Sequence, residues 1–369
     1  MSFRVGKDEV TLLRDGAQAF PSMLEAIAAA QREVLLEMYW IGDDACGRRF
    51  RDALALRAEA GVRVRVVYDA VGCLGLPDDF FAPLRESGGE ILEFHSVSPL
   101  RSAMTLDHLE RRDHRKLLVV DASVAFTGGI NLARQWLPVE EGGEGWRDDM
   151  VRVRGPAAHE LRWLFYDTWR RRPFAIVPSD VLPLPRRRTR PVYVLANRWR
   201  RRRSIRREYL VRIANARRSV DIANSYFIPN RSVRGALFRA AARGARVRLL
   251  VPAQSDVPVV QLAVEHMFES MLEHGIEVYT MRGRILHAKT AIIDERFAMI
   301  GSYNLDERSW SKNLEANLAV EDEAFASHVR GWFDHDCAEG ARVELEAWRA
   351  RPLRRRVLEW TSFALRRLW

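Results

Sequence analysis

Two stretches of this chain repeat one another, and the most specific part of the repeat is the pattern His-x-Lys-x4-Asp. It occurs at His114, Lys116 and Asp121 and again at His287, Lys289 and Asp294. The flanking sequence also repeats: 118–135 matches 291–308 at an offset of 173, 61–70 matches 244–253 at 183, and 34–43 matches 220–229 at 186, or at 187 if Tyr39 is aligned with Tyr226. Because surface loops tolerate insertions, slowly changing offsets indicate two similar halves.

Each half is predicted to alternate strands and helices. In the first half we expect strands near 34–41, 62–68, 91–94, 117–120, 124–127 and 150–153 and helices near 47–60, 79–87 and 157–170, and a similar order recurs from 204 to about 336. This alternation is typical of an α/β fold with a mixed sheet flanked by helices. We therefore predict two α/β sandwich halves at 1–175 and 204–340, a Pro/Arg-rich linker at 176–203 and a basic C-terminal helix at 341–369.

The repeated pattern places a chemical pair on each of two strands. Side chains alternate faces along a strand, so a His and a Lys two positions apart point the same way, whereas the Asp falls on the opposite face or at the strand end. Only four of the 59 basic residues are lysines, and two of those four lie in the pattern. The six pattern residues are the candidate catalytic set, in which the Asp is expected to support the scaffold.

A glycine-rich turn ending in asparagine follows each pattern, at 128–131 and 301–304. Small residues let a ligand approach the backbone, and Asn and Ser offer neutral donors to phosphate oxygens. Asn131, Asn304 and Ser302 are therefore candidate phosphate-binding residues. An acid follows each turn, Asp148 and Glu315, and an acid bonded to one imidazole nitrogen would fix the tautomer of a histidine. Asp149 competes with Asp148 for that role.

The bulk composition limits the classes of protein. The formal net charge of +10, with arginine clusters at 170–172, 186–190, 198–203 and 351–367, favours a polyanionic partner, either nucleic acid or anionic lipid. No apolar run is long enough to span a bilayer and the N-terminus lacks the apolar core of a secretion signal, so a cytoplasmic protein is expected. Cys46, Cys73 and Cys337 lack the spacing of a zinc site, and no metal or cofactor is predicted.

The C-terminal segment has the composition of an interfacial helix. Apolar residues recur at 353, 357, 360, 364 and 368 beside arginines at 351, 354–356, 366 and 367. A basic amphipathic helix with tryptophans is typical of a membrane-surface anchor, although a helix docked on its own protein would look nearly the same. Membrane contact is the favoured interpretation.

The doubled pattern with both asparagine turns, over about 34–320, resembles the phospholipase D superfamily. The segment 301–318 and the residues around Tyr226 look most like bacterial cardiolipin synthases, in their shorter form without membrane spans. The resemblance implies halves packed so that both patterns meet in one active site at their interface, a covalent phosphohistidine and no metal. By analogy His114 is the nucleophile and His287 the general acid, and the opposite assignment is nearly as credible.

The expected function is therefore phosphatidyl transfer. A phosphatidyl group would move to phosphatidylglycerol and give cardiolipin, with anionic phospholipids and the cytoplasmic face of the cell membrane as partners and no nucleic acid. A phospholipase D-type hydrolase, a nucleic-acid phosphodiesterase and a non-catalytic basic binding protein are the alternatives. Because both patterns lie on one chain, no oligomer is required.

Overall fold

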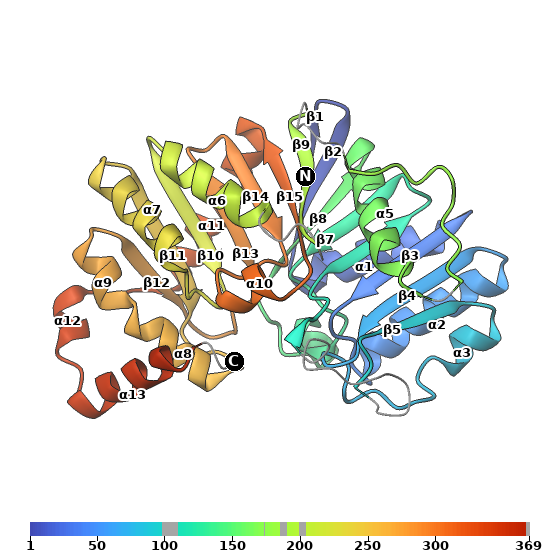
Figure 1. Cartoon of the computed structure of the whole chain (residues 1–369), viewed down its shortest axis with the longest axis horizontal. Coiled ribbons are helices and arrows are strands. Elements are labelled where there is room, and N and C mark those ends of the chain that lie inside the picture. The colour runs from blue at the N-terminus through green and yellow to red at the C-terminus, as the bar shows by residue number, and fades with distance from the viewer. Residues whose placement is uncertain (98–109, 173, 185–189, 199–203, 367–369) are drawn as a thin grey trace.

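The computed structural model contains two eight-stranded mixed sheets that lie side by side, one in each half of the chain (Figure 1). It describes residues 1–97, 110–172, 174–184, 190–198 and 204–366. The first half comprises β1 (Ser2–Val5), β2 (Asp8–Arg14), α1 (Asp15–Ala28), β3 (Glu33–Met38), α2 (Ala45–Glu59), β4 (Arg63–Asp69), α3 (Ala82–Glu86), β5 (Glu90–Phe94), β6 (Lys116–Val120), β7 (Val124–Gly128), β8 (Asp149–Arg154) and α5 (Pro156–Trp169), with short 3-10 turns at Arg134–Trp136 and Val139–Glu141.

The second half repeats this order and adds two helices at its C-terminal end. It comprises β9 (Val192–Asn197), α6 (Ser204–Asn215), β10 (Ser219–Asn224), α7 (Arg231–Ala242), β11 (Arg246–Pro252), α8 (Pro258–His266), α9 (Phe268–Glu273), β12 (Glu277–Met281), β13 (Lys289–Ile293), β14 (Phe297–Gly301), α10 (Glu307–Ser311), β15 (Glu315–Glu321), α11 (Glu323–Glu339) and β16 (Ala341–Arg342), followed by α12 (Leu345–Arg349) and α13 (Leu353–Ala364).

The two sheets have the same strand order. The first runs β1-β2-β8-β7-β6-β3-β4-β5, and the second runs β16-β12-β11-β10-β13-β14-β15-β9. Read from the opposite end, the second sheet places β9, β15, β14, β13, β10, β11 and β12 where the first has β2, β8, β7, β6, β3, β4 and β5. The predicted pair of α/β halves is thereby confirmed.

Two predicted boundaries need correction. Strand β9 lies within 176–203, which the sequence assigned to a linker, and it pairs with β15 as an edge strand of the second sheet. Strand β16 lies within 341–369, which was expected to be helical, and it pairs with β12. The prolines and arginines of 176–203 masked one apolar strand, and the C-terminal helix is broken into α12 and α13 around Pro352, because proline interrupts a helix. Residues 185–189 and 199–203 of the arginine clusters, and Arg367, lie outside the described residues.

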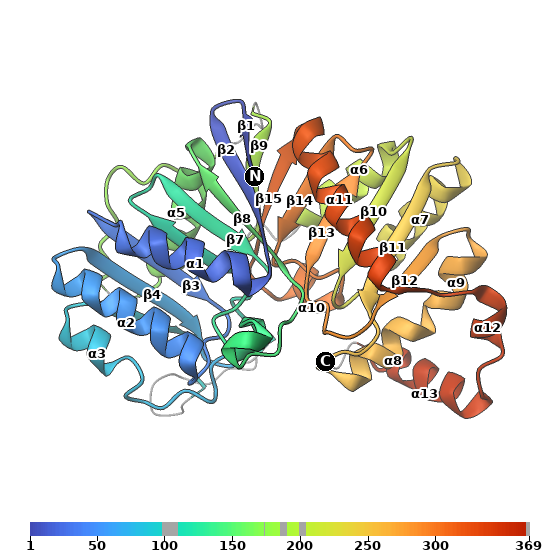
Figure 2. The same cartoon turned by 180° about the vertical axis from the view of Figure 1, so that it is seen from behind.

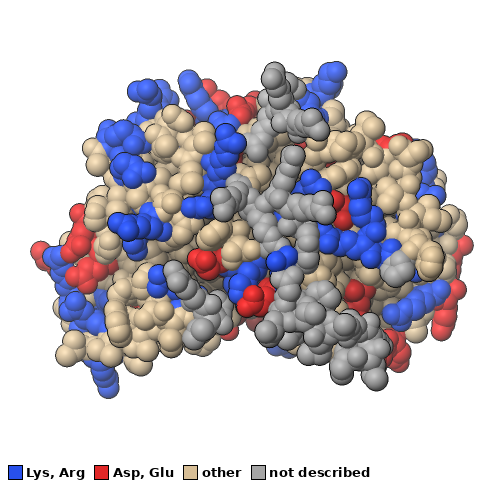
Figure 3. Space-filling view, in the orientation of Figure 1, with Lys and Arg blue, Asp and Glu red and all other residues tan. Residues whose placement is uncertain are grey.

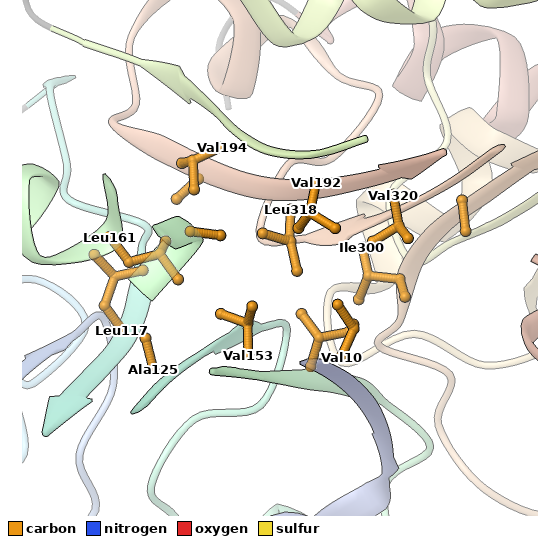
Figure 4. Packing of buried hydrophobic residues seen from close by; sticks show 14 of the residues in the cluster. Val10, Leu117, Ala125, Val153, Leu161, Val192, Val194, Ile300, Leu318 and Val320 are labelled. Carbon is orange, nitrogen blue, oxygen red and sulfur yellow. The ribbon is translucent and has the colours of Figure 1, made fainter. Parts of the chain in front are cut away.

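The halves are joined by a continuous apolar core. Helix α5 covers one face of the first sheet, and α1 and α2 cover the other (Figures 1 and 2). In the second sheet, α11 covers one face and α6 and α7 cover the other. Between the halves, Leu117 and Val153 of the first pack in the same buried cluster as Ile300 and Leu318 of the second (Figure 4). A shared core of this kind holds the two motif strands in a fixed relation.

The pattern aspartates stabilise the scaffold. Asp121 follows β6 with φ +51° and its carboxylate accepts backbone N–H groups of Gln31, Arg32 and Glu33 at 2.7–2.9 Å. Asp294 follows β13 with φ +54° and accepts those of residues 217–219 at 2.7–3.1 Å. Each aspartate therefore fixes the turn that leads into the neighbouring strand, at the end of the motif strand opposite to the histidine.

Candidate active site

Both motif histidines line one cavity of about 760 Å³ at the junction of the halves. Each histidine lies two residues before the lysine that begins its motif strand, β6 or β13. The side chains of His114 and His287 are 10% and 7% exposed, so each ring is held in protein and only its edge is open to a ligand. The two patterns could be aligned in the sequence, and the fold brings their histidines to the same cavity.

The backbone of each half positions the histidine of the other. The N–H of His114 donates to the carbonyl of Leu314 at 3.0 Å, and the N–H of His287 donates to the carbonyl of Arg147 at 2.7 Å. Each contact belongs to a short parallel bridge between the halves. Both histidines therefore depend on the assembled interface for their position.

The acids also cross between the halves. Nδ1 of His287 lies 2.7 Å from Oδ2 of Asp148, and Nδ1 of His114 lies 3.1 Å from Oε2 of Glu315. The sequence identified both acids from the alignment of the repeats but gave no sign that each would serve the histidine of the other half. With Nδ1 bonded to a carboxylate, Nε2 of each ring is left for the cavity.

The two acids are held by different donors. Asp148 accepts from the indole N–H of Trp136 at 2.9 Å, whereas Glu315 accepts from the hydroxyl of Ser309 at 2.7 Å and from that of Ser302. Ser302 was predicted to bind phosphate. The structure corrects this, because its side chain is fully buried and its hydroxyl is bonded to Glu315.

The difference between Gly129 and Ser302 at equivalent positions follows from these acids. A Cβ at Gly129 would lie 2.1 Å from Oδ1 of Asp148, so a side chain there would displace the carboxylate. At Ser302 the longer Glu315 leaves space for a hydroxyl that donates to it. The sequence indicated that the two halves differ at this turn, and the orienting acids supply the reason.

Both motif lysines are fully buried beside their own histidine. Nζ of Lys116 donates to the carbonyl of His114 at 2.8 Å and lies 4.9 Å from the centre of the Tyr39 ring. Nζ of Lys289 donates to the hydroxyl of Ser225 at 2.9 Å and lies 3.0 Å from Nδ1 of His287. Burial lowers the pKa of Lys116 to about 7 and that of Lys289 to about 8. A bound phosphate would therefore supply the charge that keeps both lysines protonated.

The turn asparagines present their amino groups to the cavity. Oδ1 of Asn131 accepts from the N–H of Trp40 at 3.2 Å, and Oδ1 of Asn304 accepts from the hydroxyl of Ser225 at 2.9 Å. Both residues line the cavity. Because the amide oxygens are occupied, the Nδ2 groups are the donors left for a phosphoryl oxygen.

Three of the candidate acids do not reach the cavity. Asp121 and Asp294, which were included in the candidate catalytic set, are bonded to backbone N–H groups of the scaffold and belong to no part of the cavity wall. Asp149, the competitor of Asp148, accepts from Arg147 at 2.6 Å and from Thr290 at 2.6 Å instead of from a histidine. These contacts assign all three to the scaffold.

The electrostatic surroundings of the two histidines differ. Burial lowers the pKa of both rings, and the lysines beside them lower it further. For His287 the charge and hydrogen bond of Asp148 act in the opposite direction, and the pKa of Asp148 is itself lowered by this partner although burial opposes the change. Burial raises the pKa of Glu315 to about 8, so the partner of His114 carries less negative charge near neutral pH.

The residues around the rings were not predicted from the sequence. Trp136 and Trp146 lie 5.2 and 5.8 Å from the His287 ring, and Tyr39 lies 4.8 Å from the His114 ring, measured between centroids. Met38 pairs with Lys116 and Asn224 with Lys289, which sets the offset at 186 and places Tyr39 over Ser225. The alternative offset of 187, which aligned two tyrosines, is wrong because strand pairing and not residue identity fixes the equivalence.

The C-terminal helix is docked and reaches the cavity. Phe363 and Arg366 line the cavity, and α13 packs along α8 (Figure 2). Glu359 on its inner face is 1% exposed and pairs with Arg351 at 2.7 Å. Arg355 pairs with Glu265 of α8 and Arg356 with Glu269 of α9, so some of the arginines that the sequence assigned to a membrane face are occupied by docking contacts. Among the described residues, no helix is both long enough and apolar enough to cross a membrane.

The sequence matches the family described as cardiolipin synthase, PLD-like domain, over residues 23–160 and 209–337. It is 32% identical to cardiolipin synthase B of Salmonella typhimurium over 90% of this chain and 82% of that protein. It is 30% identical to cardiolipin synthase 1 of Bacillus anthracis over 94% of this chain and 70% of that protein. The fold is similar to that of phosphatidylserine synthase from Haemophilus influenzae, with a TM-score of 0.73 at 14% identity over 99% of this chain and 94% of that one.

Proposed function

Because this chain belongs to the phospholipase D-like cardiolipin synthase family, we propose that it moves a phosphatidyl group from a donor phospholipid to a hydroxyl of phosphatidylglycerol, giving cardiolipin and a small alcohol. It is a cardiolipin synthase-like phosphatidyltransferase. The observation that carries the proposal is that two histidines, each bonded to the acid of the opposite half, open into one cavity.

In the first step, Nε2 of neutral His114 attacks the phosphorus of the donor. The bond from phosphorus to the leaving oxygen breaks, and protonated His287 gives its proton to that oxygen, which leaves as an alcohol. The product is a phosphatidyl group bonded to His114. In the second step, neutral His287 takes the proton of the acceptor hydroxyl. The oxygen of this hydroxyl attacks phosphorus, and the bond from phosphorus to His114 breaks.

The electrostatic difference between the pairs supports this assignment of roles. Asp148, with a lowered pKa, is ionised near neutral pH and opposes the lowering of the pKa of His287, so the protonated form that an acid needs is less disfavoured for His287 than for His114. His114 has a pKa well below its usual value, so it is neutral and able to attack. The amides of Asn131 and Asn304 would donate to the phosphoryl oxygens, and the buried Lys116 and Lys289, which do not line the cavity, would add positive charge behind its wall.

The direct test is product analysis. We expect purified protein incubated with phosphatidylglycerol vesicles to form cardiolipin and free glycerol, measured by mass spectrometry. Phosphatidic acid as the only product would identify a hydrolase. Cleavage of DNA with no change in the lipid would reject the assignment to lipid chemistry.

The outer face of α13 supports contact with a membrane surface. Leu353 and Trp360 are 74% and 60% exposed, Val357 is exposed on the same side of the helix, and Leu358 and Leu365 are exposed as well. The opposite face of α13 is docked on the protein, and Phe363 near its end lines the cavity. The exposed apolar side chains therefore point to solvent close to the site. Basic side chains spread over the surface would add attraction to anionic lipid (Figure 3). A peripheral enzyme at the cytoplasmic face of the cell membrane is the proposed setting.

Substituting the outer face of α13 should weaken membrane binding. We expect Val357→Glu/Trp360→Glu to lower the affinity for phosphatidylglycerol vesicles by about tenfold or more in sedimentation, because both side chains lose the gain from burial in lipid and two charges must enter the interface. Leu56→Glu is the matched control, since Leu56 is 61% exposed on α2 in the first half. Equal binding by the α13 variant and the control would show that this face does not contact lipid.

A further inference from the structure

The cavity is much more basic on the side of the second half than on the side of the first. Among the described residues, the first half contributes His114, Asn131 and the aromatic side chains of Tyr39, Trp40, Trp136 and Trp146 to its wall. Among the described residues, the arginines that line it all come from the second half, namely Arg206, Arg231, Arg234, Arg308 and Arg366. The pseudo-symmetry of the catalytic groups therefore does not extend to the surrounding wall.

Three of these arginines are left without an acidic partner. Nη2 of Arg206 donates to the hydroxyl of Ser232 at 3.1 Å, while its Nε is buried with no hydrogen-bond partner in the described part of the chain. Arg231 begins α7 and Arg308 lies in α10, and within the described ranges neither they nor Arg206 form an ion pair. Arg206 and Arg308 are half-buried and Arg231 is exposed, whereas the buried Arg147 and Arg248 are paired with carboxylates.

The N-termini of the equivalent helices α2 and α7 also differ in charge, and that of the second half is the more positive. Asp44 caps α2, and its carboxylate accepts from the N–H groups of Cys46 and Gly47. Asn230, at the equivalent position by the offset of 186, caps α7 without adding a charge and is followed by Arg231 and Ser232 at the cavity wall. A helix N-terminus favours an anion, and the capping side chain supplies a negative charge at α2 but not at α7.

The acids of the same wall are already occupied. Asp256 accepts from the hydroxyl of Tyr226 at 2.7 Å, Asp306 caps α10 through the N–H of Ser309 at 2.7 Å, and Glu307 accepts from the indole of Trp310 at 3.2 Å. Among the described residues, none of these carboxylates forms an ion pair with the three arginines, although the charge of Arg308 acts on Asp306 and lowers its pKa against the effect of burial. The guanidinium groups are therefore available to a ligand.

We propose that Arg206, Arg231, Arg308 and Ser232, called here the arginine lobe, bind the phosphodiester of the acceptor lipid, a phosphate separate from the one that reacts between the histidines. This inference rests on the proposed function and names its acceptor site. A guanidinium matches phosphate oxygens with two parallel donors, and the hydroxyl of Ser232 adds a neutral one. Water and small alcohols carry no such phosphate, so the lobe favours transfer to an anionic glycerophospholipid over hydrolysis.

The test compares two acceptors for one phosphatidyl-enzyme. With phosphatidylglycerol vesicles and labelled glycerol in solution, the intermediate yields cardiolipin when the acceptor is the lipid and labelled phosphatidylglycerol when it is glycerol. We expect Arg206→Gln/Arg231→Gln to lower the ratio of cardiolipin to labelled phosphatidylglycerol at least tenfold, because glycerol makes no contact with the lobe. Arg231→Glu alone, at an exposed helix start, should lower the same ratio without a risk to folding.

Arg207→Gln is the matched control, because Arg207 is exposed on the same helix as Arg206 and does not line the cavity. An unchanged ratio in both lobe variants, or an equal fall in the control, would overturn the acceptor site while leaving the transferase activity in place. Failure of the unaltered protein to make either labelled phosphatidylglycerol or cardiolipin would instead reject the proposed function itself.

Discussion

His114→Ala is expected to reduce cardiolipin formation by about 10⁴-fold or more, and His287→Ala by about 10³-fold or more. The first change removes the atom that attacks phosphorus, and the second removes the proton for a poor leaving group. Both reductions would be measured as initial rates on phosphatidylglycerol vesicles. His159→Ala is the control, since His159 is exposed on α5 and should leave the rate unchanged.

The two variants should differ with an activated donor. A phosphatidyl ester of p-nitrophenol needs little help from an acid because p-nitrophenolate is a stable anion. His287→Ala should therefore release about one equivalent of p-nitrophenol in a burst and accumulate phosphatidyl-enzyme, because the base for the second step is missing. His114→Ala should give no burst. A burst from His114→Ala and none from His287→Ala would reverse the roles, and full activity in either variant on the natural lipid would reject the two-histidine scheme.

The repeat allowed the fold to be predicted because most strands of one half have an apolar counterpart in the other at a slowly changing offset. Strands β3 and β6 each begin one residue before the position expected from the sequence. Strand β9 was missed because its apolar run lies between arginine clusters that read as a linker. Strands β1 and β2 were missed because they precede the part of the first half that repeats recognisably.

The residues of the candidate site could be predicted from the sequence, but most contacts between them could not. The histidines, lysines, asparagines and both orienting acids could be named because the repeat aligns them. Which acid serves which histidine depends on how the halves pack, and a pattern within one half holds no information about the other. Ser302 was wrongly assigned to phosphate because its hydrogen bond to Glu315 forms only in the folded turn and cannot be read from the sequence.

Asp148→Asn is expected to slow the reaction by roughly 10²- to 10⁴-fold and to move the basic limb of its pH–rate profile to lower pH. The reason lies in the crossed pairing: Asp148, in the first half, bonds His287 in the second at 2.7 Å and raises the pKa of that imidazole. An amide has no charge, so His287 would lose its proton at a lower pH and hold the wrong tautomer more often. The basic limb of kcat/KM reports the acid of the free enzyme, and we expect it to fall by at least about one unit.

Glu315→Gln should act on the other limb, because Glu315 faces His114 at 3.1 Å. Loss of this carboxylate would lower the pKa of His114 further, so the acidic limb would move to lower pH while the basic limb stays in place. This shift should be the smaller one, since the pKa of Glu315 is raised to about 8 and the residue is only partly charged near neutral pH. Asp149→Asn is the control, because Asp149 bonds Arg147 and Thr290 and no histidine. If Asp148→Asn moved the acidic limb and Glu315→Gln the basic one, His287 would be the nucleophile, and if neither limb moved, the two acids would not act through the histidines.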